Sequence, residues 1–173
     1  NEQETEAYGI DLLPMGQRMD RFEEAVEVID SLLSHELTTF QGKYFQLEQA
    51  RCEPKGPQQP RLPIVIGGGG EKRTLRIAAK FAQHWNLSFA TPEVFRKKNE
   101  ILLAHCESVG RDSSLIMRSV QIASTPDQDP AEVADNAAAL FAVGVDQVIF
   151  TLRTPYRAER VTALAKSLEA ITS

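Results

Sequence analysis

A glycine-rich loop between an apolar run and a helical pattern is the feature that most limits how this chain can fold. The run 63–66 is short, apolar and rich in β-branched residues, which is typical of a buried strand. Four consecutive glycines follow it: Gly67, Gly68, Gly69 and Gly70. From Leu75 to Ala82 apolar residues recur at helical spacing, which predicts a helix beginning near Lys72. The sequence therefore predicts a strand, a glycine loop and a helix in that order.

A helix that begins directly after such a loop can bind an anion. The N–H groups of its first turn have no partner within the helix, and the helix dipole favours negative charge there. Lys72 and Arg73 add positive charge, and the hydroxyl of Thr74 adds a hydrogen-bond donor. We therefore predict that Gly67–Gly70, with these three residues, holds the phosphate of a cofactor.

The loop matches neither of two common phosphate motifs. The dinucleotide fingerprint needs a glycine at its sixth position, where this chain has Lys72 or Arg73, depending on the first glycine chosen. The P-loop needs Gly-Lys-Ser/Thr, but Gly70 is followed by Glu71. A flexible turn without a ligand is the alternative, although four glycines carry a conformational entropy cost that a mere connection does not require.

After residue 63 the sequence alternates between strand and helix patterns. The expected strands are 64–66, 84–87, 116–123 and 148–150, and the expected helices are 72–82, 92–109, 131–141 and 156–171. Such alternation predicts a parallel sheet with right-handed crossovers. A complete (β/α)₈ barrel usually needs about 250 residues and eight strands. Half a barrel and a small open sheet both fit the pattern.

Residues 1–62 differ from the rest in pattern. A helix is expected over 18–33, with Glu23, Glu24 and Glu27 on a solvated face, and a hairpin over 38–47 turning near Gly42. Several prolines make 53–63 a semi-rigid connector. We expect an N-terminal segment 1–62 and a (β/α)₄ half-barrel over 63–173, which together form one domain or part of one.

Composition excludes several classes of function. Of 173 residues, 42% are hydrophobic and 25% charged, as in ordinary soluble proteins, and the net charge of −5 argues against nucleic acid as a partner. No apolar run approaches the roughly 20 residues of a membrane span. Neither the two cysteines nor the three histidines have metal-ligand spacing, so no metal site is expected. A reducing cytoplasm fits free thiols at Cys52 and Cys106.

Two segments resemble the luciferase-like monooxygenase superfamily. The first runs from Gly16 to Ala50 and includes Phe40-Gln-Gly-Lys-Tyr-Phe-Gln-Leu. The second includes Pro63-Ile-Val-Ile-Gly-Gly-Gly-Gly-Glu-Lys-Arg-Thr-Leu and then Ala82-Gln-His-Trp-Asn86, and is similar to members that use the deazaflavin coenzyme F420. The resemblance covers nearly the whole chain and implies the C-terminal half of a TIM-type (β/α)₈ barrel.

The resemblance also implies a cofactor and an activity. Family members transfer hydride or oxygenate with F420 or FMN, so the glycine loop would hold the phosphate of F420 or, alternatively, FMN, with a small organic molecule as substrate. Trp85 and Asn86 would lie near the cofactor at the neighbouring strand end, although a buried packing role for Trp85 fits its residue type. Arg153, Thr154 and Tyr156, after the last strand, are reserve candidates.

The resemblance assigns no catalytic residue to this chain, because the proton-exchanging groups of the family lie mainly in an N-terminal half that precedes the matched region. Half a barrel would expose two strand edges and an inner face. We therefore expect a homodimer, or pairing with a complementing N-terminal half. A non-catalytic half-barrel that acts through assembly is the alternative to an oxidoreductase.

Overall fold

The computed structural model describes residues 2–172 and divides the chain into two compact units. The first unit spans Asn1–Ile64 and the second Val65–Ser173. The division falls at the end of the proline-rich connector, where the sequence pattern changes to alternating strands and helices.

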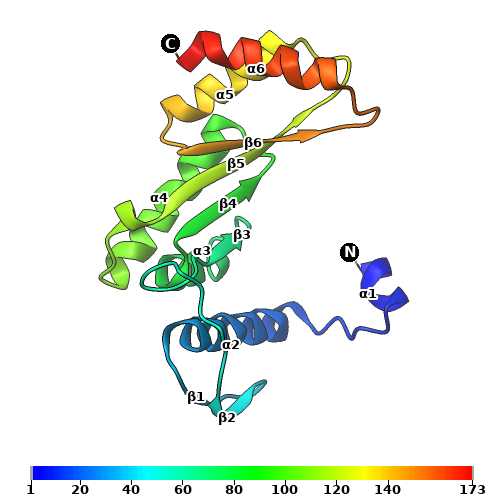
Figure 1. Ribbon diagram of the computed structural model, residues 1–173. Coiled ribbons are helices and arrows are strands. Elements are labelled where there is room, and N and C mark those ends of the chain that lie inside the picture. Colours follow the sequence, from blue (N-terminus) through cyan, green and yellow to red (C-terminus); the bar gives the residue numbers. More distant parts are fainter. Residues whose placement is uncertain (1, 173) are drawn as a thin grey trace. The chain divides into compact units, whose positions relative to one another are not determined.

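The first unit contains two helices and a hairpin (Figure 1). Its elements are α1 (Glu2–Ala7), α2 (Met15–Ser34), β1 (Thr38–Gln41) and β2 (Gln46–Ala50). The strands β1 and β2 pair antiparallel, which confirms the predicted hairpin. The acidic start forms the short helix α1, which the sequence pattern did not predict because it has no apolar periodicity.

The carboxylate of Glu24 holds the turn of the hairpin, so the expectation that this residue is merely solvated is wrong. It accepts hydrogen bonds from the main-chain N–H groups of Lys43, Tyr44 and Phe45, at 3.0, 2.8 and 3.3 Å. A Cβ at Gly42 would overlap Glu24 Oε2. The hairpin therefore needs both the glycine at its turn and the acidic residue on α2.

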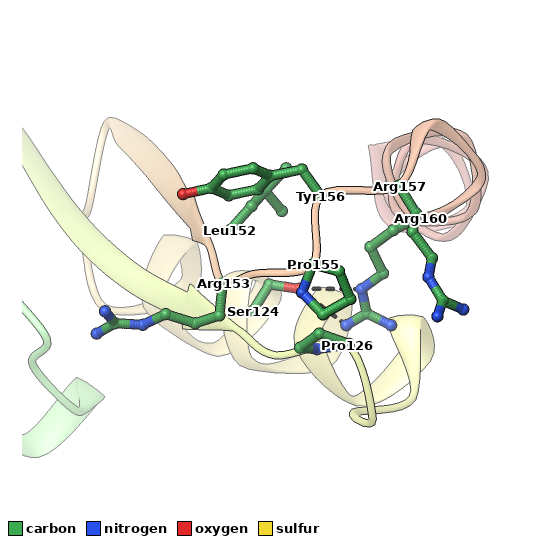
Figure 2. Close-up of a pocket in the computed structure, with 8 residues that line it drawn as sticks. All are labelled: Ser124, Pro126, Leu152, Arg153, Pro155, Tyr156, Arg157 and Arg160. Carbon is green, nitrogen blue, oxygen red and sulfur yellow. Dashed lines mark hydrogen bonds between the residues drawn. The ribbon is translucent and has the colours of Figure 1, made fainter.

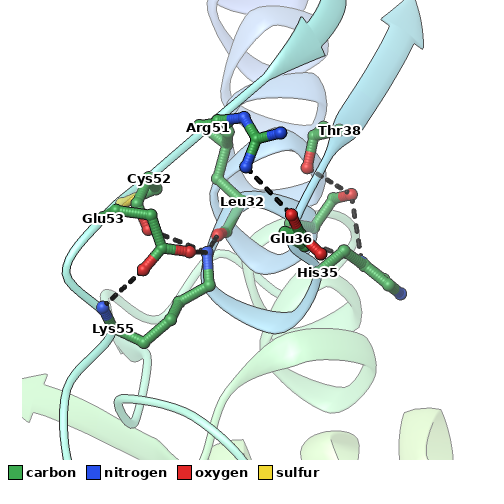
Figure 3. A network of polar contacts seen from close by, with 9 residues as sticks. Leu32, His35, Glu36, Thr38, Arg51, Cys52, Glu53 and Lys55 are labelled. Carbon is green, nitrogen blue, oxygen red and sulfur yellow. Dashed lines mark hydrogen bonds and ion pairs between the residues drawn. The ribbon is translucent and has the colours of Figure 1, made fainter.

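The connector is fastened to the carboxyl end of α2 (Figure 3). Lys55 Nζ donates to the carbonyl oxygens of Leu32 and Cys52, at 2.7 and 2.8 Å. A lysine at the end of a helix satisfies carbonyl groups that have no helical partner and complements the helix dipole. Arg61 forms an ion pair with Asp30, so both ends of the connector contact α2.

The second unit is a four-stranded parallel sheet in which helices alternate with strands. The strands are β3 (Val65–Gly67), β4 (His84–Ser88), β5 (Met117–Ser124) and β6 (Gln147–Leu152), in the spatial order β3-β4-β5-β6. The helices are α3 (Thr74–Phe81), α4 (Pro92–Ser108), α5 (Pro130–Ala142) and α6 (Ala158–Thr172), with the 3₁₀ turn η1 (Ser113–Leu115) before β5. The predicted alternation is confirmed.

One face of this sheet packs against the helices. Each strand lies beside the one before it, and right-handed crossovers then place every connecting helix on the same side. Side chains from alternate strand positions form the core with the helices: Ile66, Trp85, Leu87, Val120 and Ile122 from strands, and Leu75, Phe95, Leu102, Ala137 and Leu140 from helices. The opposite face, here called the interior face, is the one that a half-barrel would turn toward the inside of a complete barrel.

In the second unit the helix boundaries lie close to the expected ones, and two helix starts are corrected. Thr91 and Asp129 cap α4 and α5, each followed by proline, and Gly144 ends the α5 turn with φ of 94°. The helix expected from Lys72 begins at Thr74, because residues 71–73 form a turn closed by the Leu75 N–H on Gly70 O at 3.0 Å. Likewise α6 begins at Ala158, two residues after Tyr156.

Candidate functional site

The glycine loop lies where β3 ends and α3 begins, at the carboxyl edge of the sheet. Gly68 has φ of 112°, which only glycine adopts readily. Its N–H donates to Asn86 O at 2.9 Å, and its carbonyl accepts the Trp85 indole N–H at 2.9 Å. The loop is therefore fixed to β4 through both main-chain groups of one residue.

Beyond Gly68, the main chain of Gly69, Gly70 and Thr74 forms a cradle in which added side chains would crowd neighbouring atoms. A Cβ at Gly70 would lie 2.7 Å from Thr74 Oγ1, and one at Gly69 would lie 3.0 Å from Leu87 Cδ1. Within residues 2–172, the N–H groups of Gly69, Gly70 and Thr74 donate no hydrogen bond. Unpaired N–H groups at a helix N-terminus, with no Cβ in the way, match what a phosphate requires.

Helix α4 braces the same loop, which sequence reasoning did not foresee. Lys98 Nζ pairs with Glu71 Oε1 at 2.8 Å, and the His105 imidazole lies 2.8 Å from Glu71 O. The hydrogen bond from Lys98 lowers the pKa of Glu71. Lys98 and His105 stand two turns apart on one helix face, and only the packing of α4 beside α3 brings that face to the loop.

The other loop residues differ in exposure. Lys72 is exposed, whereas Arg73 and Thr74, at the start of α3, are half-buried. Thr74 nevertheless keeps its hydroxyl beside Gly70.

Trp85 supports the loop from the core side. Its side chain has no exposed surface, and its ring stacks on Phe95 of α4 at 5.7 Å between centroids. The packing role that its residue type suggests is therefore present, together with the hydrogen bond to Gly68 O. Contact of Trp85 or Asn86 with a cofactor stays a prediction.

A row of polar side chains crosses the opposite face of the sheet. The imidazole Nε2 of His84 lies 2.6 Å from Ser119 Oγ, which also accepts from Asn86 Nδ2 at 2.7 Å. Gln121 Nε2 donates to Asn86 Oδ1 at 3.2 Å. These residues occupy alternate positions of β4 and β5, so the interior face is polar where the helix-side face is apolar.

The His84 imidazole should make stability depend on pH. Burial lowers its pKa from the ordinary 6.5, opposed in part by the Asp146 carboxylate. The folded protein therefore binds this proton less tightly than the unfolded chain does. The contribution of His84 to the free energy of unfolding is complete above pH 6.5 and is lost as the pH falls from 6.5 through the folded-state pKa. Urea unfolding at pH 7.5 and about pH 5.5 should show a smaller loss for His84→Gln than for the parent. Equal losses would contradict this role.

The reserve candidates lie in the loop after β6, beside a small pocket of about 40 Å³ (Figure 2). Arg153 and Tyr156 line it, and Thr154 lies between them in the chain. Arg160 lines it too, but its guanidinium donates to Ser124 Oγ, at 2.8 Å from Nη2, and to Gln128 O, so it ties α6 to β5. Figure 2 shows Arg153 and Arg157 extending in opposite directions from the loop.

The described residues hold no cluster of histidine, cysteine or acidic side chains suited to a metal ion. Cys52 and Cys106 are both free thiols, and burial raises the pKa of Cys106. Over residues 2–172 no helix has the length and apolar character needed to cross a membrane.

The parallel βα units, with the glycine loop at the carboxyl edge of the sheet, have the arrangement of part of an α/β barrel. The family model of the luciferase-like monooxygenases matches residues 1–171, and the chain belongs to that family. The family contains oxidoreductases and monooxygenases, with F420-dependent and flavin-dependent members.

Curated relatives carry both kinds of activity. The chain is 30% identical over 134 residues to an F420-dependent glucose-6-phosphate dehydrogenase of Kineococcus radiotolerans, covering 75% of this chain and 38% of that protein. It is 28% identical over 117 residues to pyrimidine monooxygenase RutA of Agrobacterium fabrum, covering 66% of this chain and 31% of that protein. The chain thus spans about a third of the length of these relatives.

Solved structures show the same fold. An F420-dependent secondary alcohol dehydrogenase superposes with a TM-score of 0.82 at 16% identity, covering 93% of this chain and 64% of that one. The long-chain alkane monooxygenase LadA superposes with a TM-score of 0.76 at 15% identity, covering 97% and 59%. The expected fold class, part of a TIM-type barrel with an added helix and hairpin, is confirmed.

Proposed function

We propose that this chain supplies the phosphate-binding part of an F420-dependent oxidoreductase. The observation that carries the proposal is the cradle at Gly69, Gly70 and Thr74, where three N–H groups lack an acceptor within residues 2–172. F420 carries a phosphate, and the related glucose-6-phosphate dehydrogenases are F420-dependent by name.

Each residue of the cradle would contribute a different interaction with that phosphate. The N–H groups would donate to its oxygens, the Thr74 hydroxyl lies beside Gly70 to add another donor, and Lys72 supplies exposed positive charge. Trp85 and Lys98 keep the loop in shape from the core and from α4. The bound cofactor would supply hydride transfer, while this chain orients it and excludes water.

FMN is the second candidate, because it also carries a phosphate and the cradle does not distinguish the groups to which that phosphate is attached. Two facts favour F420. The curated relatives include F420-dependent enzymes, and F420 has a longer anionic tail, which suits the basic residues Lys72, Arg73 and Arg76 on an otherwise acidic chain.

A fluorescence titration with four ligands tests both parts of the proposal. F420 is compared with the deazaflavin nucleoside, which lacks the phosphate and the anionic tail, and FMN is compared with riboflavin, which lacks only the phosphate. We expect F420 to bind more tightly than FMN, and each to bind at least about tenfold more tightly than its phosphate-free form, a difference of about 1.4 kcal/mol. Equal affinity with and without phosphate would contradict the cradle, and tighter binding of FMN would reverse the choice of cofactor.

Assembly is part of the proposal. Among the described strands, β3 and β6 are edges of the sheet, and Val65 on β3 is 57% exposed. Unpaired strand edges favour association. We propose that a second copy or a complementing N-terminal barrel half covers them, and that catalysis on a small organic substrate requires the completed barrel.

A further inference from the structure

Phe89 occupies an unusual place directly after β4. Its φ of 53° lies in the left-handed region, which is rare for a bulky aromatic residue, and its side chain is 55% exposed. The main chain is held there by the Phe89 N–H, which donates to Gln121 O on β5 at 2.8 Å. Residues held in such sparsely populated backbone conformations cluster at functional sites.

Arg153 follows β6 and lies near the Phe89 ring. Phe89 follows β4, so the two residues lie on either side of β5. The Arg153 N–H donates to Ser124 O at 3.1 Å, and its guanidinium carbon lies 5.9 Å from the centre of the Phe89 ring. Within residues 2–172 it has no carboxylate partner. Arg153 continues the alternation of Ile149 and Thr151 on β6, which places it on the interior face of the sheet.

The pair therefore stands at the carboxyl edge of the sheet, the same edge as the glycine loop after β3. In α/β barrels, substrates and cofactors meet at this edge, on loops that follow different strands. A guanidinium without a carboxylate partner binds a carboxylate or phosphate through two parallel hydrogen bonds, and the aromatic ring beside it offers an apolar contact.

We propose that Phe89 and Arg153 form a substrate subsite for a small organic anion, a carboxylate or phosphate attached to an apolar body. The anionic group binds the Arg153 guanidinium and the apolar body packs on the Phe89 ring. As a substrate assignment the inference rests on the proposed function, whereas the binding itself is a property of this chain's own residues.

Binding to the cofactor-free chain tests the subsite. Benzoate and phenyl phosphate serve as probes, with benzyl alcohol as the neutral counterpart and inorganic phosphate as the anion without a body. Chemical-shift titration of the ¹⁵N-labelled chain should show benzoate or phenyl phosphate binding at least about fivefold more tightly than either control. The preferred probe of the two then identifies the anionic group.

Three variants locate the site. Arg153→Gln should weaken binding of the preferred probe by at least about fivefold. Phe89→Asn should weaken it without unfolding the chain, since asparagine tolerates the left-handed backbone. Arg157→Gln is the matched control, because that exposed arginine extends away from Arg153 (Figure 2), and it should leave affinity unchanged.

The opposite results overturn the subsite. Binding of benzyl alcohol as tight as that of the anions would do so, as would equal losses in Arg153→Gln and Arg157→Gln, or no binding of either probe. F420 affinity measured on the same variants separates this failure from that of the proposed function. A variant that binds F420 normally but shows no probe effect refutes the subsite alone.

Discussion

Replacing Trp85 with alanine is expected to lower the free energy of unfolding by about 3–5 kcal/mol. The side chain has no exposed surface, stacks on Phe95 and donates to Gly68 O. Alanine would leave a cavity between β4 and α4 and an unpaired carbonyl in the glycine loop. Urea unfolding of the parent and variant chains, followed by circular dichroism, measures the difference.

Trp85→Phe separates packing from loop support. The phenyl ring can keep contact with Phe95 but cannot donate to Gly68 O, so the expected loss of stability is smaller, about 1–2 kcal/mol. If the indole N–H positions the loop, F420 affinity should fall in this variant while the fold persists. A loss below about 1 kcal/mol for Trp85→Ala would show that the tryptophan is not the core residue described.

Replacing Gly70 with valine is expected to reduce F420 affinity by at least about tenfold, or about 1.4 kcal/mol. A Cβ at this position would lie 2.7 Å from Thr74 Oγ1, so the loop or Thr74 would have to shift, which would displace the N–H groups proposed to bind the phosphate. The measurement is the same fluorescence titration used for the parent chain, with the thermal melting curve recorded in parallel.

Gly16→Val is the matched control for that substitution. A Cβ at Gly16 meets nothing within 4 Å, and this glycine lies in α2 of the first unit. Its F420 affinity should equal that of the parent. Tenfold weaker binding in both variants would point to a general loss of structure, and unchanged binding in Gly70→Val would place the phosphate elsewhere.

Sequence patterns predicted those parts of the fold that depend on local periodicity and turn chemistry. The strand, glycine loop and helix order around Gly67–Gly70 follows from β-branched residues, glycines and helical spacing in one short segment. The parallel sheet follows from the alternation of strands and helices. The expected ranges of α4 and α5 lie within one residue of the observed ones, because proline at a helix start fixes φ and glycine after a helix end adopts the left-handed conformation readily.

The supports of the site could not be predicted, because they come from elements far apart in the sequence. Lys98 and His105 look like ordinary residues of a helix surface until α4 packs beside α3. Glu24 was assigned to solvent because nothing local links it to a turn about 20 residues away. The left-handed backbone of Phe89 has no sequence signal, since such a conformation is not expected for phenylalanine.

The most direct test of the central claim is a ¹H–¹⁵N correlation spectrum of the chain recorded with increasing F420. We predict that the largest amide shifts fall on Gly69, Gly70 and Thr74, whose N–H groups lack acceptors within residues 2–172, and that the phosphate-free deazaflavin leaves these signals in place. Binding of F420 with these amides unchanged, or with the largest shifts in the first unit, would contradict the account.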